Sequence, residues 1–213
     1  NIAGLGLKNH FFPTMPMING IEQNELLLVG SVVLNNAIGG LNPEVIRASA
    51  MLTKLPVIVW FPTISAQNFL NKSTYEIPPE WGGKESRLSC TILGITVIED
   101  GKLIPEAKAV LQTIKENNCI LATGHLSWQE AKLLVEEAVA MGIGRIIITH
   151  PIYQRIAMPL EVQQELAQKK GVYIEQCYSM YFIDDIPLEE IARQIKAVGA
   201  EKCLLTSDTG QMD

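Results

Sequence analysis

The feature that most constrains the fold is the regular alternation of helical and strand patterns from residue 104 onward. Apolar residues spaced three or four apart predict four helices, which cover residues 105–118 and 127–142 and begin at Pro159 and Pro187. Short apolar runs predict four strands between and after them, at residues 119–123, 145–149, 172–175 and 203–206. Apolar strands separated by helices are typical of a parallel sheet covered on both faces, so the fold class is α/β.

The first half of the chain continues this pattern less regularly. It predicts strands at residues 2–7, 26–34 and 57–61 and a helix over 42–54, which brings the total to seven strands. A right-handed βα series closes at eight strands, and such barrels need about 250 residues. We therefore expect one domain over residues 1–213, a TIM (β/α)₈ barrel that lacks its first strand and its last helix.

Residues 64–103 interrupt the repeat. They contain Trp81 followed by two glycines and a predicted hairpin over 91–103 that turns at Asp100-Gly101, where glycine accepts a positive φ. Because this insertion follows the carboxyl end of a strand, we expect it near the barrel mouth. The pattern leaves open whether it is a lid or a surface loop.

Composition narrows the classes of partner. A formal charge of −6 and a pI near 5.2 argue against nucleic acid, because binding to phosphates depends on clustered cations. No run of eighteen apolar residues predicts a membrane span, and the first residues lack a signal-peptide pattern. The four cysteines form no CxxC pair and suit buried thiols in a reducing compartment. We expect a cytoplasmic protein with a small-molecule substrate. The sequence leaves open whether the protein forms a homo-oligomer.

The chemistry is indicated by the three histidines of the chain, each of which stands where a predicted strand ends. They are His10, His125 and His150, and a fourth strand ends at Asp208. In a barrel such ends converge on the face that carries active sites. Imidazole and carboxylate together suit a divalent metal, zinc first and manganese or iron as alternatives, with a position left for water. Asp208 would take the proton of that water, ligate the metal, or do both; the alternative is that it only caps the following helix.

Other polar residues near strand ends are weaker candidates. Lys8 lies two residues before His10, so its ammonium could stabilise a developing oxyanion, or form a salt bridge inside the barrel. Glu175 could act as a base or pair with Lys8, and Tyr153 and Arg155 could clamp an anionic substrate. Asn35 precedes a glycine-rich loop at the same mouth. Ordinary surface roles are the alternative for Tyr153 and Arg155.

Three short motifs resemble the metal-dependent hydrolases of the amidohydrolase superfamily. They are Thr123-Gly124-His125, Ile148-Thr149-His150 and Thr206-Ser207-Asp208, at the ends of strands five, six and eight of a full barrel. The resemblance is strongest to an uncharacterised branch that also carries Lys8-Asn9-His10 and the segment from Asn35 to Pro43. It implies metal ligands at His125, His150 and Asp208. The superfamily's His-x-His pair on strand one does not occur in this sequence, which fits the expectation that this strand is missing. Its bridging ligand on strand four is also absent, and unless Lys8 substitutes for it from strand two, the resemblance implies one metal rather than two.

The resulting expectation is an enzyme that activates a metal-bound water to cleave an amide, ester, lactone or related bond. Two alternatives come from other classes. One is a lyase or aldolase that forms a Schiff base at Lys8, and the other is a barrel that binds a metal or an anion without turnover.

Overall fold

Parallel strands that follow one another in chain order form the centre of the molecule. The computed structural model describes residues 4–21, 26–72 and 93–209. Within these ranges, one sheet has the order β10-β9-β8-β7-β4-β3, and a short sheet pairs β1 with β2. The strands are β1 (Gly4–Gly6), β2 (Leu27–Val29), β3 (Ser31–Val33), β4 (Ile58–Trp60), β7 (Ile120–Ala122), β8 (Ile146–Ile148), β9 (Val172–Cys177) and β10 (Cys203–Thr206).

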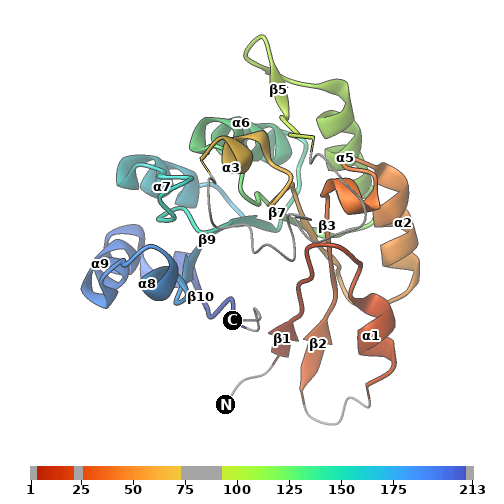
Figure 1. The fold of residues 1–213 in the computed structure, drawn as a ribbon, viewed down its shortest axis with the longest axis horizontal. Coiled ribbons are helices and arrows are strands. Elements are labelled where there is room, and N and C mark those ends of the chain that lie inside the picture. Colours follow the sequence, from red (N-terminus) through yellow and green to blue (C-terminus); the bar gives the residue numbers. More distant parts are fainter. Residues whose placement is uncertain (1–3, 22–25, 73–92, 210–213) are drawn as a thin grey trace, which may run out of the picture.

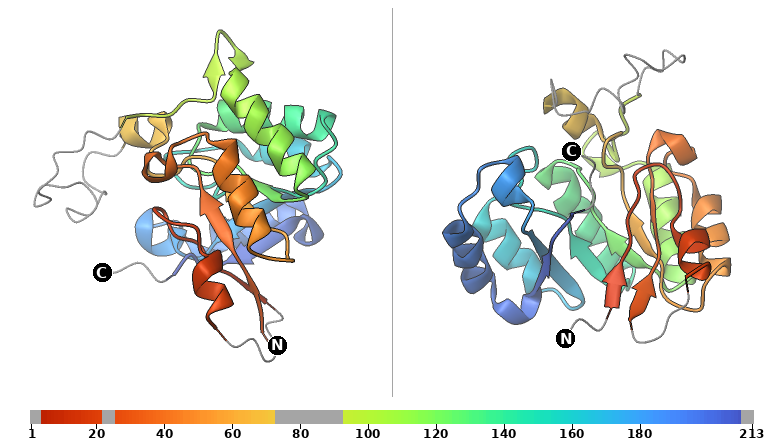
Figure 2. Two further views of the ribbon diagram at one scale, coloured as in Figure 1. Left: turned by 90° about the vertical axis from the view of Figure 1, so that its right-hand side faces the viewer. Right: turned by 60° about the horizontal axis from the view of Figure 1, so that its bottom comes forward.

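The helices that connect successive strands of the large sheet cover one side of this curved sheet, as Figures 1 and 2 show. Right-handed crossovers between strands that follow in chain order place every connecting helix on the same face. Helix α2 packs on α5, α6 on α7, and α7 on α9. The helices are α1 (Met15–Asn19), α2 (Pro43–Met51), α3 (Gln67–Lys72), α5 (Pro105–Glu116), α6 (Trp128–Ala140), α7 (Leu160–Ala167), α8 (Met180–Ile183) and α9 (Leu188–Val198).

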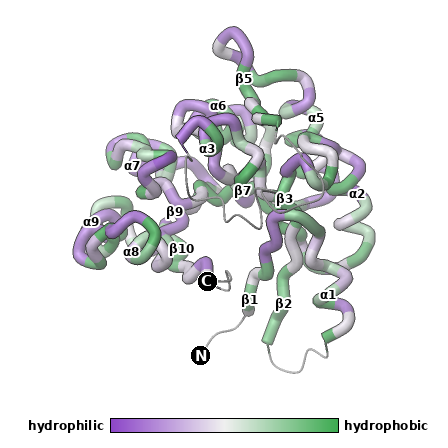
Figure 3. Tube along the Cα trace, viewed as in Figure 1, coloured by the Kyte–Doolittle hydropathy of each residue, from purple (hydrophilic) through white to green (hydrophobic). Residues whose placement is uncertain are grey.

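The two faces of the sheet bury apolar side chains unequally. The large core lies between the sheet and the helices and includes Phe61, Leu121 and Ile146, all fully buried. A smaller cluster on the opposite, concave face consists of Val33, Ile58, Trp60 and Ala122. In Figure 3, β2 and β7 are coloured hydrophobic, whereas hydrophobic and hydrophilic residues alternate along the helices. The helix-covered face therefore supplies most of the burial that stabilises the fold.

Most predicted elements are confirmed within one to three residues. The capping box of α6 is present, with Ser127 accepting from the Glu130 backbone and the Glu130 carboxylate accepting from the Ser127 backbone. The strand predicted over residues 26–34 is interrupted at Gly30, where a Cβ would meet the Met15 sulfur at 2.5 Å. The close packing of α1 on this glycine explains the break.

The short helices α1, α3 and α8 were not predicted, because four to six residues are too few to show a helical apolar period. In the insertion, β5 (Ile98–Glu99) and β6 (Lys102–Leu103) form the predicted antiparallel hairpin, with positive φ at Asp100 and Gly101. Trp81 and the first residues of the predicted hairpin lie outside the described ranges.

The α/β class and the parallel sheet are confirmed, but hydrogen-bonded closure into a barrel is not seen. Among the described residues, the six-stranded sheet ends at β10 and β3, β1 pairs only with β2, and no pairing joins β1 to β10. No helix in these ranges is long and apolar enough to cross a membrane.

Candidate metal centre

The loops that follow β7, β8 and β10 each contain a residue with left-handed backbone. These residues are Gly124 (φ 63°), His150 (φ 40°) and Asp208 (φ 47°). Left-handed φ is uncommon for histidine and aspartate and costs free energy unless the surroundings impose it. Two of the predicted site residues are therefore held in strained conformations at the carboxyl ends of parallel strands.

Two buried threonines fix the loops of His125 and His150 to each other. The Thr123 hydroxyl accepts from the Thr149 backbone at 2.9 Å, and the Thr149 hydroxyl accepts from the Gly124 backbone at 3.2 Å. Gly124 also lies against the end of β4, where a Cβ would meet the Phe61 carbonyl oxygen at 2.2 Å. Only glycine fits there, so the motif before His125 is explained by a close backbone approach.

His150 lies between two carboxylates and is 1% exposed. Its Nδ1 is 3.2 Å from Glu175 Oε2, and its Nε2 is 3.4 Å from Asp208 Oδ2. Neither contact has the direction of a hydrogen bond. Burial lowers the pKa of His150, but the Glu175 and Asp208 carboxylates outweigh burial and raise it to about 10. Without a metal, this imidazole is therefore the cation that the two carboxylates require.

Asp208 also pairs with Lys8, which comes from the other end of the strand order. Lys8 Nζ is 3.0 Å from Asp208 Oδ1 and lies 5.6 Å from the centre of the Trp60 ring. Burial would raise the pKa of Asp208, but His150 and the Lys8 ammonium bring it well below its usual range. The carboxylate is therefore ionised at neutral pH and is held by two cationic partners.

Cys177 completes the group whose ligand atoms converge. A ring nitrogen of His150, the Cys177 sulfur and an Asp208 oxygen all lie within 4.8 Å of one another, so this group could hold a metal ion. Burial raises the pKa of the Cys177 thiol, but the neighbouring His150 and the Ser179 hydroxyl lower it below its ordinary value. The sequence analysis assigned Cys177 to packing. The signal for the site was its position two residues after Glu175, which places both side chains on one face of β9.

His10 and His125 lie beside this group rather than within it. The centroid of the His125 ring is 6.0 Å from that of His150 and 6.4 Å from that of His10. Burial is the main cause that lowers the pKa of His10 to about 4 and that of His125 well below its usual value. Both imidazoles are therefore neutral, which is the form that ligates metals, and His125 Nδ1 is buried without a hydrogen bond.

Asn35 connects the loops after β1, β3 and β4. Its amide nitrogen donates to the His10 carbonyl and to the Thr63 hydroxyl, and its oxygen accepts from the Thr63 and Ser65 backbones. Thr63 in turn contacts His10 Nδ1 at 2.8 Å. With 1% exposure, Asn35 positions His10 through these hydrogen bonds. Sequence reasoning did not identify Thr63.

Tyr153 and Arg155 are also buried, on the side of His125 that faces α3. Arg155 hydrogen-bonds the Tyr153 hydroxyl, and its guanidinium lies 5.2 Å from the Phe69 ring of α3. The rings of Phe69 and Tyr153 lie 5.2 and 5.6 Å from that of His125. Helix α3, which belongs to the insertion, therefore lies against the strand ends, and the rings of Phe69 and Tyr153 contact His125.

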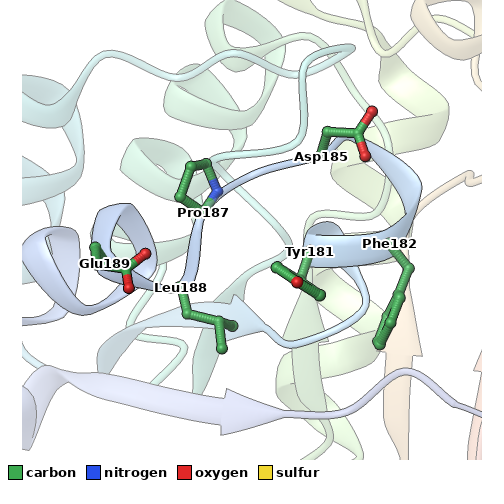
Figure 4. Close-up of a pocket in the computed structure, with 6 residues that line it drawn as sticks. All are labelled: Tyr181, Phe182, Asp185, Pro187, Leu188 and Glu189. Atoms are coloured by element: carbon green, nitrogen blue, oxygen red, sulfur yellow. The ribbon is translucent and has the colours of Figure 1, made fainter.

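A separate pocket lies at α8 and the start of α9, and Figure 4 shows its lining. It is lined by Tyr181, Phe182, Asp185, Pro187, Leu188 and Glu189. None of the predicted site residues lines it, so it is distinct from the group around His150.

The donor set fits a divalent transition metal. Imidazole nitrogen, carboxylate oxygen and thiolate sulfur are the ligand types of zinc and related ions. Both ring nitrogens of His150, His125 Nδ1 and Glu175 Oε2 are buried without a hydrogen bond. Buried polar atoms in this state are uncommon and indicate an absent partner such as an ion or a water.

Comparison with known proteins gives a family but no named relative. No curated protein and no solved structure is detectably similar to the chain. The model of one family matches residues 1–175, which is most of the chain and includes the strand-end residues from Lys8 to Glu175. The chain therefore belongs to the family of unknown function DUF6282.

Proposed function

We propose that this protein is a metal-dependent hydrolase of the amidohydrolase type, with one divalent metal, zinc in the first place, and a small-molecule substrate. The observation that carries the proposal is a row of charges at the carboxyl ends of parallel strands, in which Lys8 and Asp208 are partly buried and His150 and Glu175 are buried. Buried charges are costly unless they are paired, and strained, strongly perturbed groups of this kind concentrate at functional sites.

The finer fold that we propose is a TIM barrel. The strands follow one another in chain order, and the connecting helices lie on one face of the sheet. The other face can be covered only if the sheet curls on itself, as it does in a barrel. The ion pair between Lys8 and Asp208 joins the loops after β1 and β10, the two strands that would flank the expected first strand of a closed barrel. Active sites of such barrels lie at the carboxyl ends of the strands.

The residues of this site have complementary roles in hydrolysis. A divalent metal held by His150 and Asp208, with His125 and His10 beside them, would supply Lewis acidity and lower the pKa of a water that it binds. Asp208 is ionised and accepts the proton that an attacking water loses. Lys8, paired with Asp208, offers its ammonium to the oxyanion that forms when a carbonyl is attacked. Glu175 lies 3.2 Å from His150 Nδ1, and Nε2 faces Asp208, so these two residues would orient His150 as a metal ligand.

The ion pair of Lys8 favours this electrostatic role over a Schiff base. A lysine attacks a carbonyl as a neutral amine, whereas a carboxylate at 3.0 Å stabilises the ammonium. Lys8→Arg keeps the charge and removes the amine, so hydrolysis should persist at a reduced rate, and borohydride should trap no adduct in the wild type.

The test measures metal content and hydrolysis together. Purified protein should contain close to one equivalent of zinc or a related metal, and His150→Ala should lose most of it, because one imidazole provides a large share of the affinity. Asp185→Asn, at an exposed carboxylate outside the site, is the control. Wild-type metal content in His150→Ala, or a metal-bound protein inert on amides, esters, lactones and phosphoesters, would remove the proposal.

A further inference from the structure

Cys177 stands on the part of β9 that faces the candidate metal centre. Side chains alternate along a strand, so Cys177 shares its face with Glu175, the partner of His150. In the sheet register Cys177 lies beside Thr206, two residues before Asp208. Two neighbouring strands thus bring the thiol and the carboxylate to the same place.

We propose that the Cys177 thiolate is a direct ligand of the metal, which makes the centre a nitrogen, oxygen and sulfur site. This inference rests on the proposed function, because it requires a metal at His150 and Asp208. Three atoms that lie within 4.8 Å of one another are all within about 2.8 Å of a common point. Zinc–ligand distances are about 2.0–2.3 Å, so each ligand atom needs to move by less than about 1 Å.

Cys177 belongs to the main apolar core, but polar groups also surround its sulfur, which is not expected of a cysteine that only packs. Its sulfur is 3.0 Å from the Ser179 hydroxyl and close to a His150 ring nitrogen. The sulfur of Cys119, which is also buried, contacts backbone groups instead, among them the Asn117 carbonyl oxygen at 3.7 Å. A buried thiol among a histidine, a hydroxyl and a carboxylate is in the environment of a reactive or ligating cysteine.

Charge balance favours the thiolate. With a dication, Lys8 carrying +1, and −1 each on Glu175, Asp208 and the Cys177 thiolate, the buried group has no net charge. A neutral thiol would leave one uncompensated positive charge in a largely buried group, and such charges are costly. A metal also deprotonates a coordinating thiol outright.

A sulfur ligand restricts which metal the site selects. Thiolates favour zinc, cobalt and other softer ions over manganese, which prefers oxygen ligands. The ligand set without Cys177 contains only imidazole and carboxylate and does not make this distinction.

Cobalt(II) is the probe that reports the ligand directly. Full-length protein is freed of metal and titrated with Co²⁺, and its absorption is recorded in the visible and near-ultraviolet regions. A thiolate ligand gives an intense sulfur-to-cobalt charge-transfer band in the near ultraviolet, whereas nitrogen and oxygen ligands give only the visible bands. The same titration is made with Cys177→Ser, Cys177→Ala and the control Cys203→Ser, at a half-buried cysteine at the amino end of β10.

The expected result is a charge-transfer band in the wild type and in Cys203→Ser that is lost in both Cys177 variants. Their cobalt affinity should fall by about 100-fold or more, because even residues that only orient a ligand cost about 10–100-fold. Visible cobalt bands without a charge-transfer band in the wild type would overturn the inference and leave the metal centre in place. Absence of any cobalt spectrum would overturn both. A charge-transfer band that persists in both Cys177 variants would also overturn the inference, because another cysteine would then supply the sulfur ligand.

Discussion

The two faces of β9 are both buried, but one packs against helices whereas the other lies beside the charged residues of the candidate site. On the helix side, Val172, Ile174 and Gln176 are fully buried, and Gln176 donates to Gln163 of α7. On the concave side, Cys177 is equally buried and Glu175 nearly so, yet their neighbours include His150 and Asp208. Burial among apolar groups stabilises the fold, whereas burial among charges stores free energy that a bound ion can release. The difference teaches that buried fraction alone does not separate core from site.

The largest expected effect is on turnover, from a change on the concave side. Asp208→Asn keeps the shape of the side chain but removes its capacity to accept a proton, so hydrolysis should fall by roughly 10²–10⁴-fold while the fold survives. Turnover on any substrate found by screening is the measurement, with metal content determined alongside. Full activity in Asp208→Asn would mean that Asp208 only caps the turn after β10.

The reverse experiment changes the helix side. Leu121 is fully buried under the helices, and Leu121→Ala should lower the free energy of unfolding by about 2–5 kcal/mol through lost burial and a cavity. Metal affinity of the folded protein should stay within a few-fold of the wild type. Denaturant unfolding and metal titration measure the two quantities, and a parallel loss of both would show that the two faces are coupled.

Glu175 tests whether the concave carboxylates act through the imidazole. Glu175→Gln keeps an acceptor for the Thr206 hydroxyl but removes the charge beside His150 Nδ1, so metal affinity should fall roughly 10–100-fold. Glu165→Gln, at an exposed carboxylate on α7 that pairs with Lys132, should leave the affinity unchanged. An unaltered affinity in Glu175→Gln would place Glu175 outside the metal centre.

The smallest effect comes from a helix start remote from the site. Ser127→Ala removes the cap of α6 and should cost about 1 kcal/mol of unfolding free energy. Metal affinity should not change. A weakened metal centre in this variant would indicate that α6 transmits strain to His125, two residues before the cap.

The sequence predicted the elements from residue 104 onward well, because Leu134, Val135 and their neighbours repeat with a helical period that burial imposes. It also placed His150, Asp208 and Lys8 at strand ends that the structure brings together. It could not identify Cys177, because a buried thiol in an apolar strand is typical of packing. Its position two residues after Glu175 indicates the face of β9, and the register of β9 and β10 adds that this face lies beside the strand that leads to Asp208.

The sequence also did not predict that Asn35, Tyr153 and Arg155 are buried. Their partners belong to segments that are remote in sequence: Asn35 contacts Thr63, and Arg155 contacts Phe69 of α3. The predicted roles of these three residues in substrate binding remain predictions. In the structure, they hold loops and rings around the histidines.

The ion pair between Lys8 and Asp208 joins residues that are 200 positions apart. During synthesis, therefore, Lys8 and His10 leave the ribosome long before their acidic partner does, and a chain that ends after β8 presents His125 and His150 without either carboxylate. Contacts of such long separation form late, because the loop between them must first be ordered. The metal would accordingly load only onto a finished chain, so that an incomplete protein neither captures the ion nor acts on substrate.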